Sequence, residues 1–367
     1  MDGEAEAERG VAIVGAERRR GRGAVSNRTG RFETAERIDC DDGWGGLDDL
    51  PAFERTIHVE AARQIVTTND SPDISFDQSI NPYRGCEHGC VYCYARPSHC
   101  YLGHSAGLDF ETQLYVKPNA ASLLRAELGR RGYVAKTIAL GANTDPYQPI
   151  EREQAITRAL LEVLREARHP VGIVTKSALV LRDLDILAEM ARDDLVKVAV
   201  SVTTLDRKLA RAMEPRAASP PKRIEAIAAL SAAGVRTAVM VAPVIPGLND
   251  HEIETILAAA AKAGASEAGY VTLRLPLEIA GLFEEWLAAE RPERAARVMT
   301  LVRSLHAGRA YRADFGLRQR GSGPFAEQIA QRFRLATRRL GLGERRLRLR
   351  TDLFQPPQPE RGQMRLI

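Results

Sequence analysis

Short apolar runs alternate with longer amphipathic segments from about residue 76 onward. The runs predict six strands, at Ile80–Arg84, Lys136–Leu140, Val171–Thr175, Val196–Val202, Thr237–Ala242 and Tyr270–Leu275. The segments between them predict helices at Pro118–Arg131, Glu151–Arg168, Ala178–Arg192, Pro221–Ala233 and Asp250–Ala263. Strands separated by helices predict a parallel sheet, because a parallel pair of strands needs a crossover connection.

Polar side chains, glycines and prolines recur directly after the predicted strands. They are Gly85 and Cys86, Gly141 to Asp145, Lys176, Ser201 to Thr204, Pro243 to Pro246, and Arg274 to Pro276. In a barrel the strand ends converge on one face, whereas in an open doubly wound sheet most of them lie along an edge. The recurrence therefore favours an α/β fold, a partial (βα)6 barrel over residues 76–290.

The flanking regions differ from this pattern. Residues 1–45 are rich in Glu, Arg and Gly without a buried periodicity, so we expect a disordered, basic N-terminal arm. Residues 46–75 form an N-terminal extension. Residues 291–367 predict a helical, Arg-rich C-terminal extension with helices at Pro292–Gly308 and Gly323–Gly341 and a tail rich in Pro and Gln.

Composition narrows the class of protein. A hydrophobic content of 44% over 367 residues is enough for a large core. The sequence has neither the apolar run of a membrane span nor the N-terminal apolar stretch of a secretory signal. We therefore expect a cytoplasmic protein that does not associate with membranes.

Basic residues are unevenly distributed, although the net charge is only +4. Between Arg303 and Arg350 there are 13 Arg against three acidic residues. Such a region is a candidate contact for a phosphate backbone, since Arg pairs well with phosphate. Solvated helix faces in an Arg-biased sequence account for the same pattern.

Four of the five cysteines fall between positions 86 and 100, and such an odd, clustered set points to metal or redox use rather than to a disulfide framework. Cys86, Cys90 and Cys93 bring three thiols together directly after the first predicted strand. A structural zinc site needs a fourth ligand, for which His88, His99, His104 and Cys100 are available. Three cysteines on a four-iron cluster instead leave one iron open. Cys40 and Cys100 are interpreted as packing residues.

The CxxxCxxC spacing, with Tyr92 directly before the last cysteine, resembles the signature of the radical S-adenosylmethionine (SAM) superfamily. The resemblance implies a partial (βα)6 barrel and a [4Fe–4S] cluster held by Cys86, Cys90 and Cys93. It also implies reductive cleavage of SAM to a 5′-deoxyadenosyl radical, which abstracts a hydrogen atom from a substrate. A flavodoxin-type or ferredoxin-type protein would supply the electron.

The same resemblance implies SAM contacts at the strand ends. Many members carry a Gly-Gly-Glu motif for the methionine amine where this chain has Asn143 and Thr144, so one of these would take that role. The cation of Lys176 suits the SAM carboxylate. Ser201 and Thr203 offer hydroxyls for ribose or carboxylate oxygens, and the segment from Ala242 would form an apolar wall and offer backbone groups to adenine. Hydroxyls at such positions also cap helices.

Within the superfamily, the span from about Gly21 to Leu366 resembles the spore-photoproduct-lyase-related group, in its subgroup of unassigned function. Four segments carry the resemblance: 21–33, 81–86, 144–151 and 351–354. It aligns Tyr92, Asn143, Lys176 and Ser201 with SAM contacts of the lyase.

One departure from the lyase is important. The lyase returns a hydrogen atom from a cysteine beside its second-strand SAM contact, where this chain has Gly141 and Ala142. Either another residue such as Tyr147 quenches the product radical, or the substrate differs.

Two alternatives stay open: a nucleic-acid-modifying radical SAM enzyme, and a zinc-stabilised nucleic-acid-binding module that uses the cysteines only structurally.

Overall fold

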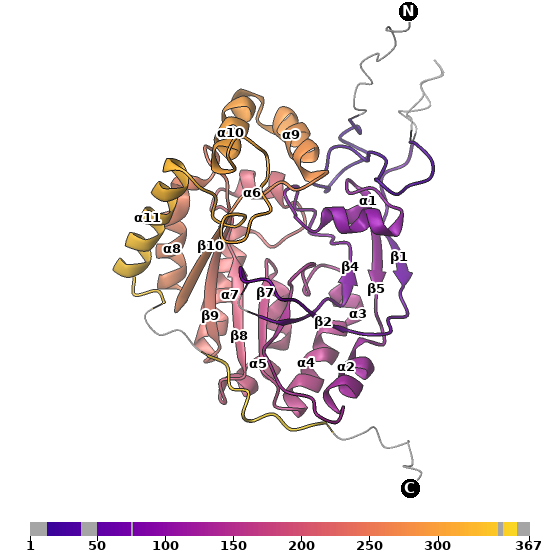
Figure 1. Ribbon diagram of the computed structural model, residues 1–367, viewed down its shortest axis with the longest axis vertical. Helices are drawn as coiled ribbons and strands as arrows, with labels where there is room; N and C mark the ends of the chain where they lie inside the picture. Colours follow the sequence, from indigo (N-terminus) through magenta and orange to yellow (C-terminus); the bar gives the residue numbers. More distant parts are fainter. Residues whose placement is uncertain (1–12, 38–49, 75, 344–347, 358–367) are drawn as a thin grey trace, which may run out of the picture.

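The computed structural model describes residues 13–37, 50–74, 76–343 and 348–357, and its main element is a seven-stranded sheet (Figure 1). Six strands lie side by side in chain order, each parallel to its neighbours. They are β3 (Gln78–Ile80), β6 (Ile138–Leu140), β7 (Val171–Thr175), β8 (Val196–Ser201), β9 (Arg236–Val244) and β10 (Glu267–Thr272). The short β2 (Val66–Thr68) pairs antiparallel with β3 at the edge. The predicted parallel sheet of six βα units is confirmed.

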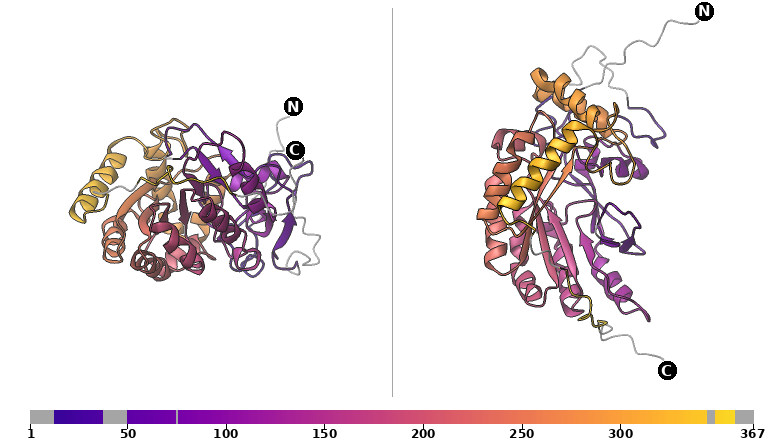
Figure 2. Two further views of the ribbon diagram at one scale, coloured as in Figure 1. Left: turned by 90° about the horizontal axis from the view of Figure 1, so that it is seen from below. Right: turned by 60° about the vertical axis from the view of Figure 1, so that its left-hand side comes forward.

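Helices pack along the outer side of this sheet (Figures 1 and 2). They are α2 (Ala120–Leu128), α3 (Glu151–Gln154), α4 (Ile156–Glu166), α5 (Leu184–Ala191), α7 (Pro220–Ala232) and α8 (Ile253–Lys262). The main core lies between the two layers, where Val196, Val198 and Val200 of β8 are fully buried. Their spacing of two follows from the alternation of side chains along a strand.

Two of the predicted helices are divided. The segment Glu151–Arg168 becomes α3 and α4, because Ala155 between them has a φ of +50° and ends the first helix. The segment Ala178–Arg192 starts as the 3-10 helix η2 (Ala178–Asp183) before α5 begins. The short α6 (Arg207–Met213) and the longer α9 (Ile279–Glu290) were not predicted.

The first predicted strand, Ile80–Arg84, is wrong as a single element. β3 ends at Ile80, and β4 (Tyr83–Arg84) belongs to a second, three-stranded sheet in the order β1 (Thr56–Val59), β5 (Gln113–Val116), β4. Pro82 separates the two strands and has no N–H for a ladder hydrogen bond. This break turns the chain toward the cysteines.

The expectation of a disordered N-terminal arm is wrong for residues 13–37, while residues 1–12 and 38–45 lie outside the described part of the chain. Ala24, Val25 and Ser26 are fully buried. Arg22, although charged, is also buried, and its guanidinium donates to the backbone carbonyls of Glu111 and Phe53 at 3.0 Å each. This segment has few apolar residues, and backbone hydrogen bonds anchor it.

The C-terminal part contributes α10 (Pro292–Leu305) and α11 (Pro324–Arg339), both close to their predicted bounds. α11 lies against α8, and Arg332 pairs with Glu254 across the contact at 2.6 Å (Figure 2). Near the end of the described chain, Phe354 packs on Tyr133 and His169. In the described residues, no helix has the length and apolar character that a membrane crossing requires.

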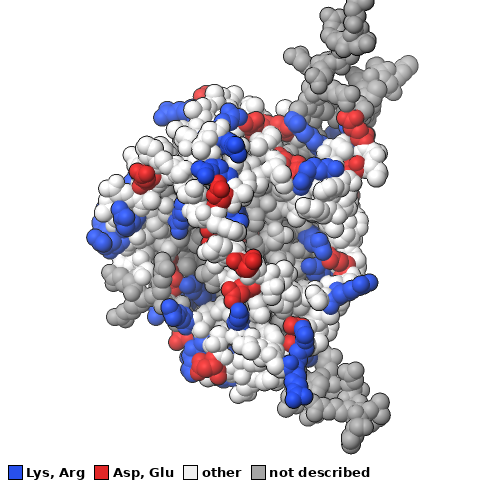
Figure 3. Space-filling view, in the orientation of Figure 1, with Lys and Arg blue, Asp and Glu red and all other residues white. Residues whose placement is uncertain are grey.

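Five of the C-terminal arginines are paired with acidic residues. Arg303 pairs with Glu284, Arg312 with Asp314, Arg318 with Asp73, Arg332 with Glu254, and Arg350 with Asp352. Basic and acidic side chains also intermingle over the face that Figure 3 shows. This pairing reduces the positive field of the C-terminal region and favours its interpretation as a solvated surface.

Candidate active site

The three clustered cysteines lie in a loop that follows β4. Gly85 starts the loop with a φ of +73°, which glycine adopts without strain. The N–H of Cys86 then donates to the carbonyl of Phe110 at 2.9 Å. Tight turns keep the rest of the loop compact: the carbonyls of Cys86, Cys90 and Cys93 accept N–H groups from Gly89, Cys93 and Arg96.

The three thiols are free, and they lie within electrostatic range of one another. Burial raises the pKa of Cys86 well above its usual value, and Asp145 and the other two cysteines raise it further. Burial also raises the pKa of Cys90 and Cys93, while the cation of Lys176 acts in the opposite direction on both. Bound metal offsets the negative charge that burial disfavours, and thiolates suit iron–sulfur clusters.

Each of the three histidines considered as a fourth zinc ligand contacts another group through one ring nitrogen. His88 faces Asp145, with Nδ1 and Oδ2 3.3 Å apart, and His99 and His104 hydrogen-bond to a backbone carbonyl and to a tyrosine hydroxyl. Among the described residues, no three or more His, Cys, Asp and Glu side chains gather closely enough to hold one metal ion. Cys100 is fully buried beside Ala106 and Leu282, as expected of a packing residue. Cys40 lies outside the described residues. The thiols of the loop are soft donors, the ligand type that iron–sulfur clusters take.

Asp145 joins the cysteine loop to the end of β7. Its Oδ1 accepts from the hydroxyl of Thr175 at 2.7 Å, and its Oδ2 accepts from the backbone N–H of Lys176 at 2.7 Å. Burial by itself raises the pKa of Asp145, but His88 and these hydrogen bonds outweigh it and hold the pKa below its usual value. Asp145 thus fixes the loop next to the strand end that carries Lys176.

A second polar group lies at the ends of β7, β8 and β9. Lys176 Nζ donates to the Ala242 carbonyl at 3.1 Å and to the Thr203 hydroxyl at 3.3 Å, and it lies 3.3 Å from the carboxylate of Glu214. That carboxylate accepts from Thr203 at 2.6 Å and from the hydroxyl of Tyr92. Burial lowers the pKa of Lys176 to about 8. The structure thus brings Tyr92, Lys176, Thr203 and Ala242 together beside the cysteines.

The remaining predicted SAM contacts lie after β6 and at the end of β8. The N–H of Asn143 is held by the side chain of Asn81 at 3.0 Å, and the Asn143 side chain is half-buried. The hydroxyl of Thr144 is buried and donates to the carbonyl of Tyr83 at 2.9 Å. Ser201 is buried at the end of β8. Asn143 is therefore the more accessible of the two alternatives for the methionine amine.

Tyr147, the candidate quencher of the product radical, lies between β6 and α3. It is fully buried in the main core, its hydroxyl turned toward Asp183, and the structure does not bring it to the cysteines. The phenol beside the cluster motif is Tyr94, which is partly exposed and donates to the carbonyl of Ala142. The guanidinium of Arg274 lies over its ring, 4.3 Å from the centroid.

Sequence reasoning missed Tyr94 and the buried Glu214. Tyr94 directly follows the last cysteine, and this adjacency was the available signal. Glu214 had only a weak signal, an acidic residue before Pro215 directly after α6.

The N-terminal arm closes the outer side of the cysteine loop. The carboxylate of Glu111 accepts the N–H groups of Gly23 and Ala24 at 2.8 Å each, and it pairs with the fully buried Arg96 at 2.6 Å. A Cβ on Gly23 would overlap the carbonyl oxygen of Gly89, which lies between Cys86 and Cys90. Backbone therefore packs directly on backbone where the arm crosses the loop.

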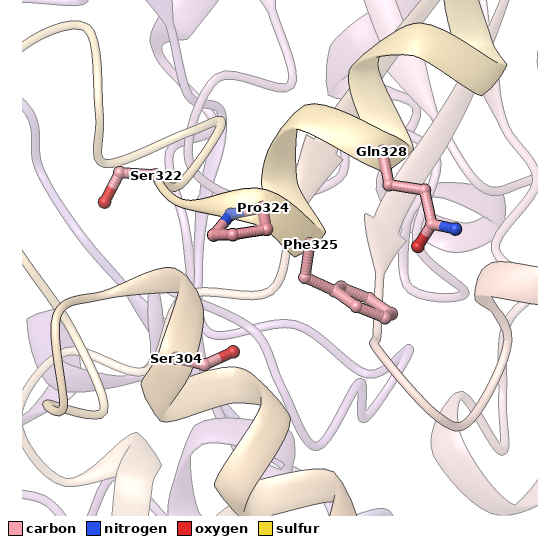
Figure 4. A pocket seen from close by; sticks show the side chains of 5 residues that line it. All are labelled: Ser304, Ser322, Pro324, Phe325 and Gln328. Carbon is pink, nitrogen blue, oxygen red and sulfur yellow. The ribbon is translucent and has the colours of Figure 1, made fainter.

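A separate cavity of about 500 Å³ lies where α10 and α11 meet (Figure 4). Ser304, Phe325 and Gln328 line it. Its lining has no charged group and no residue of the cysteine loop, so it offers none of the chemistry described above.

Comparison with known proteins identifies the family. A model described as the radical SAM superfamily matches residues 80–260, which hold the cysteine loop and four of the six parallel strands, β6 to β9. An uncharacterized protein of Mycobacterium tuberculosis, Rv2578c, is 41% identical over 232 residues, covering 63% of this chain and 68% of its own. An uncharacterized protein of Methanocaldococcus jannaschii, MJ0683, is 30% identical over 173 residues, covering 47% and 62%.

The fold has solved counterparts. A spore photoproduct lyase variant with bound AdoMet (SAM) and dinucleoside spore photoproduct superposes with a TM-score of 0.58 at 16% identity, covering 78% of this chain and 80% of the lyase. The partial barrel predicted from the sequence is thus the fold of this lyase. Enzymes of the radical SAM superfamily use SAM and a [4Fe–4S] cluster. The cysteine loop, the parallel strands and the match over residues 80–260 together show that this chain belongs to the radical SAM superfamily.

Proposed function

We propose that this chain holds a [4Fe–4S] cluster on Cys86, Cys90 and Cys93, cleaves SAM reductively and abstracts a hydrogen atom from a substrate still to be identified. The bound cluster would supply the electron that splits SAM into methionine and a 5′-deoxyadenosyl radical. The observation that carries the proposal is the meeting of three free thiols with Lys176 and the ends of β7, β8 and β9.

The chain's own residues would bind and orient SAM. Lys176 is the cation placed for the SAM carboxylate, and Glu214 and the Ala242 carbonyl hold its ammonium group in position. The hydroxyl of Thr203, anchored on Glu214, stands beside it for ribose or carboxylate oxygens. Because Thr203 and Glu214 are buried and the Lys176 side chain is only 15% exposed, their interactions with a charged ligand are screened less than they would be in open water.

Anaerobic reconstitution with iron and sulfide tests the proposal. We expect a brown protein with the broad visible absorbance of an iron–sulfur cluster that makes 5′-deoxyadenosine from SAM when dithionite is added. A colourless protein that retains only zinc, or a clustered protein that leaves SAM intact, would overturn it.

Lys176→Met is expected to weaken SAM binding by at least about tenfold while the cluster is retained, since a hydrogen bond to a charged group contributes about 1.5–3 kcal/mol. Calorimetry on the anaerobic, cluster-loaded protein measures the Kd. Lys197→Met is the matched control, because Lys197 lies near the start of β8 and pairs with Glu267. Equal SAM affinity in both variants would contradict the role of Lys176.

A second candidate is modification of nucleic acid. The lyase of the same fold binds a dinucleoside spore photoproduct, and a radical SAM Nα-GlyT isomerase of Pseudomonas phage M6 is 26% identical over 181 residues. The pairing of the C-terminal arginines gives this candidate little support from that region. Anisotropy titrations with labelled DNA and RNA test it, since backbone binding must weaken steeply as salt rises. Absence of binding at low salt would exclude it.

A further inference from the structure

A strongly basic groove lies on the outer side of the cysteine loop. It encloses a cavity of about 750 Å³ between the N-terminal arm, α6, the 215–220 loop and the end of α9. Its walls carry seven cationic side chains against two carboxylates, Glu214 and Glu290. Glu214 is already paired with Arg223, so the groove has a large excess of positive charge.

Most of the cations at the rim of this groove have no acidic partner among the described residues. Arg207, Lys208 and Arg211 are exposed on α6, and Arg20 is exposed on the arm. No carboxylate of the described residues forms an ion pair with any of these four. In the C-terminal region, by comparison, five arginines have acidic partners: Arg303, Arg312, Arg318, Arg332 and Arg350.

The floor of the groove is also the back of the cysteine loop. Pro215 and Gly23 line the groove, and a Cβ on Gly89 would lie 3.2 Å from the Pro215 ring. The N–H of Val91, one residue after Cys90, donates to the carbonyl of Met213 at the end of α6. A molecule seated in the groove is therefore separated from the cysteines by little more than the loop backbone.

The two sides of the loop serve different needs. Lys176 and Thr203 stand on the inner side, toward the strand ends, where SAM and a substrate have to meet. Glu214 spans both sides: it lines the groove, and its carboxylate accepts from Tyr92 and Thr203. An electron, unlike a substrate, does not need to pass the loop as a molecule.

We infer that this groove is the docking surface for an acidic one-electron carrier protein of the flavodoxin or ferredoxin type. The inference rests on the proposed function. Its support is charge complementarity, which steers an acidic partner to a basic patch, together with the groove's place against the cysteines. In the transfer the carrier is oxidised by one electron, and the loaded enzyme is reduced by one electron.

Reversal of the charges on α6 tests the inference. We compare the triple variant Arg207→Glu, Lys208→Glu, Arg211→Glu with a control that makes the same change in charge on α11, Arg334→Glu, Arg338→Glu, Arg339→Glu. The control residues are exposed and lie outside the groove. A second α6 variant with Gln at the same three positions keeps the test valid if the reversal disturbs folding. All proteins are cluster-loaded and handled anaerobically.

Flavodoxin binding is measured by biolayer interferometry at low and high salt, and SAM cleavage is driven either by reduced flavodoxin or by dithionite. We expect the α6 reversal to raise the flavodoxin Kd at least tenfold at low salt. The flavodoxin concentration needed for half-maximal cleavage should rise by the same factor as the Kd. Cleavage driven by dithionite should be unchanged. The α11 control should stay within twofold of the unaltered protein in every measurement. Flavodoxin binding by the unaltered protein should weaken as salt rises.

Three results would overturn the docking surface. One is an unchanged flavodoxin Kd in both α6 variants. Another is a loss of dithionite-driven cleavage as large as the loss of flavodoxin-driven cleavage. The third is loss of oligonucleotide binding with flavodoxin affinity retained, which would assign the groove to a phosphate backbone. Failure of dithionite to drive cleavage in the unaltered protein refutes the proposed function instead, while the binding measurement still reports on the groove.

Discussion

Alanine at Cys86, Cys90 or Cys93 is expected to abolish SAM cleavage. Each thiolate would hold a separate iron, so loss of one leaves the cluster with two ligands and a second open iron. Iron content per chain, visible absorbance and 5′-deoxyadenosine formation measure the effect. Circular dichroism shows whether the variant is folded, which separates loss of the cluster from loss of the barrel.

Cys100→Ala is the matched control for these variants. Cys100 is also a buried thiol near the loop, but it packs between Ala106 and Leu282. Its truncation leaves a small cavity and is expected to cost about 1 kcal/mol of stability, with cleavage retained. If a variant at Cys86, Cys90 or Cys93 cleaved SAM as well as Cys100→Ala does, the ligand assignment would be wrong.

Gly23→Ala is expected to have the second largest effect, although position 23 is remote from the cysteines in sequence. The added methyl group would overlap the carbonyl of Gly89, so either the arm or the cysteine loop must move. Overpacking of this kind costs about 1–3 kcal/mol. Displacement of the arm would also remove two N–H partners from the buried carboxylate of Glu111. We expect cluster content and the lifetime of the cluster in air to fall severalfold.

Gly15→Ala provides the comparison within the same arm, because nothing lies within 4 Å of a Cβ at that position. Iron analysis and the decay of visible absorbance after exposure to air are measured for both variants. Equal cluster lifetimes in Gly15→Ala and Gly23→Ala would show that the arm does not protect the loop.

The strands of the barrel could be predicted because buried strands appear in the sequence as short apolar runs. Val171–Thr175 and Val196–Ser201 are flanked by helices, so they read as apolar runs of strand length. The boundary errors have local causes. Pro82 divides a segment that was predicted as one strand, and the positive φ of Ala155 interrupts a continuous amphipathic pattern.

The site was predictable where one residue type dictates the chemistry and unpredictable where direction or distance decides. The cysteines and Lys176 follow from thiol chemistry and from a rare lysine at a strand end. Tyr147 also follows a strand, but its side chain turns into the core, which position in the sequence does not reveal. The arm was missed because its anchor, Glu111, lies 88 residues further along the chain.

The crossing of the arm over the cysteine loop has a consequence for how this part of the sequence can diverge. Glu111 binds the arm through the main-chain N–H groups of Gly23 and Ala24, and every residue except proline has such a group. The contact therefore restricts the size of the side chain at this position, not its chemical character. Substitution at position 23 is limited by the space above Gly89, where even one added carbon atom does not fit. Neighbouring positions of the arm can accept other side chains far more freely.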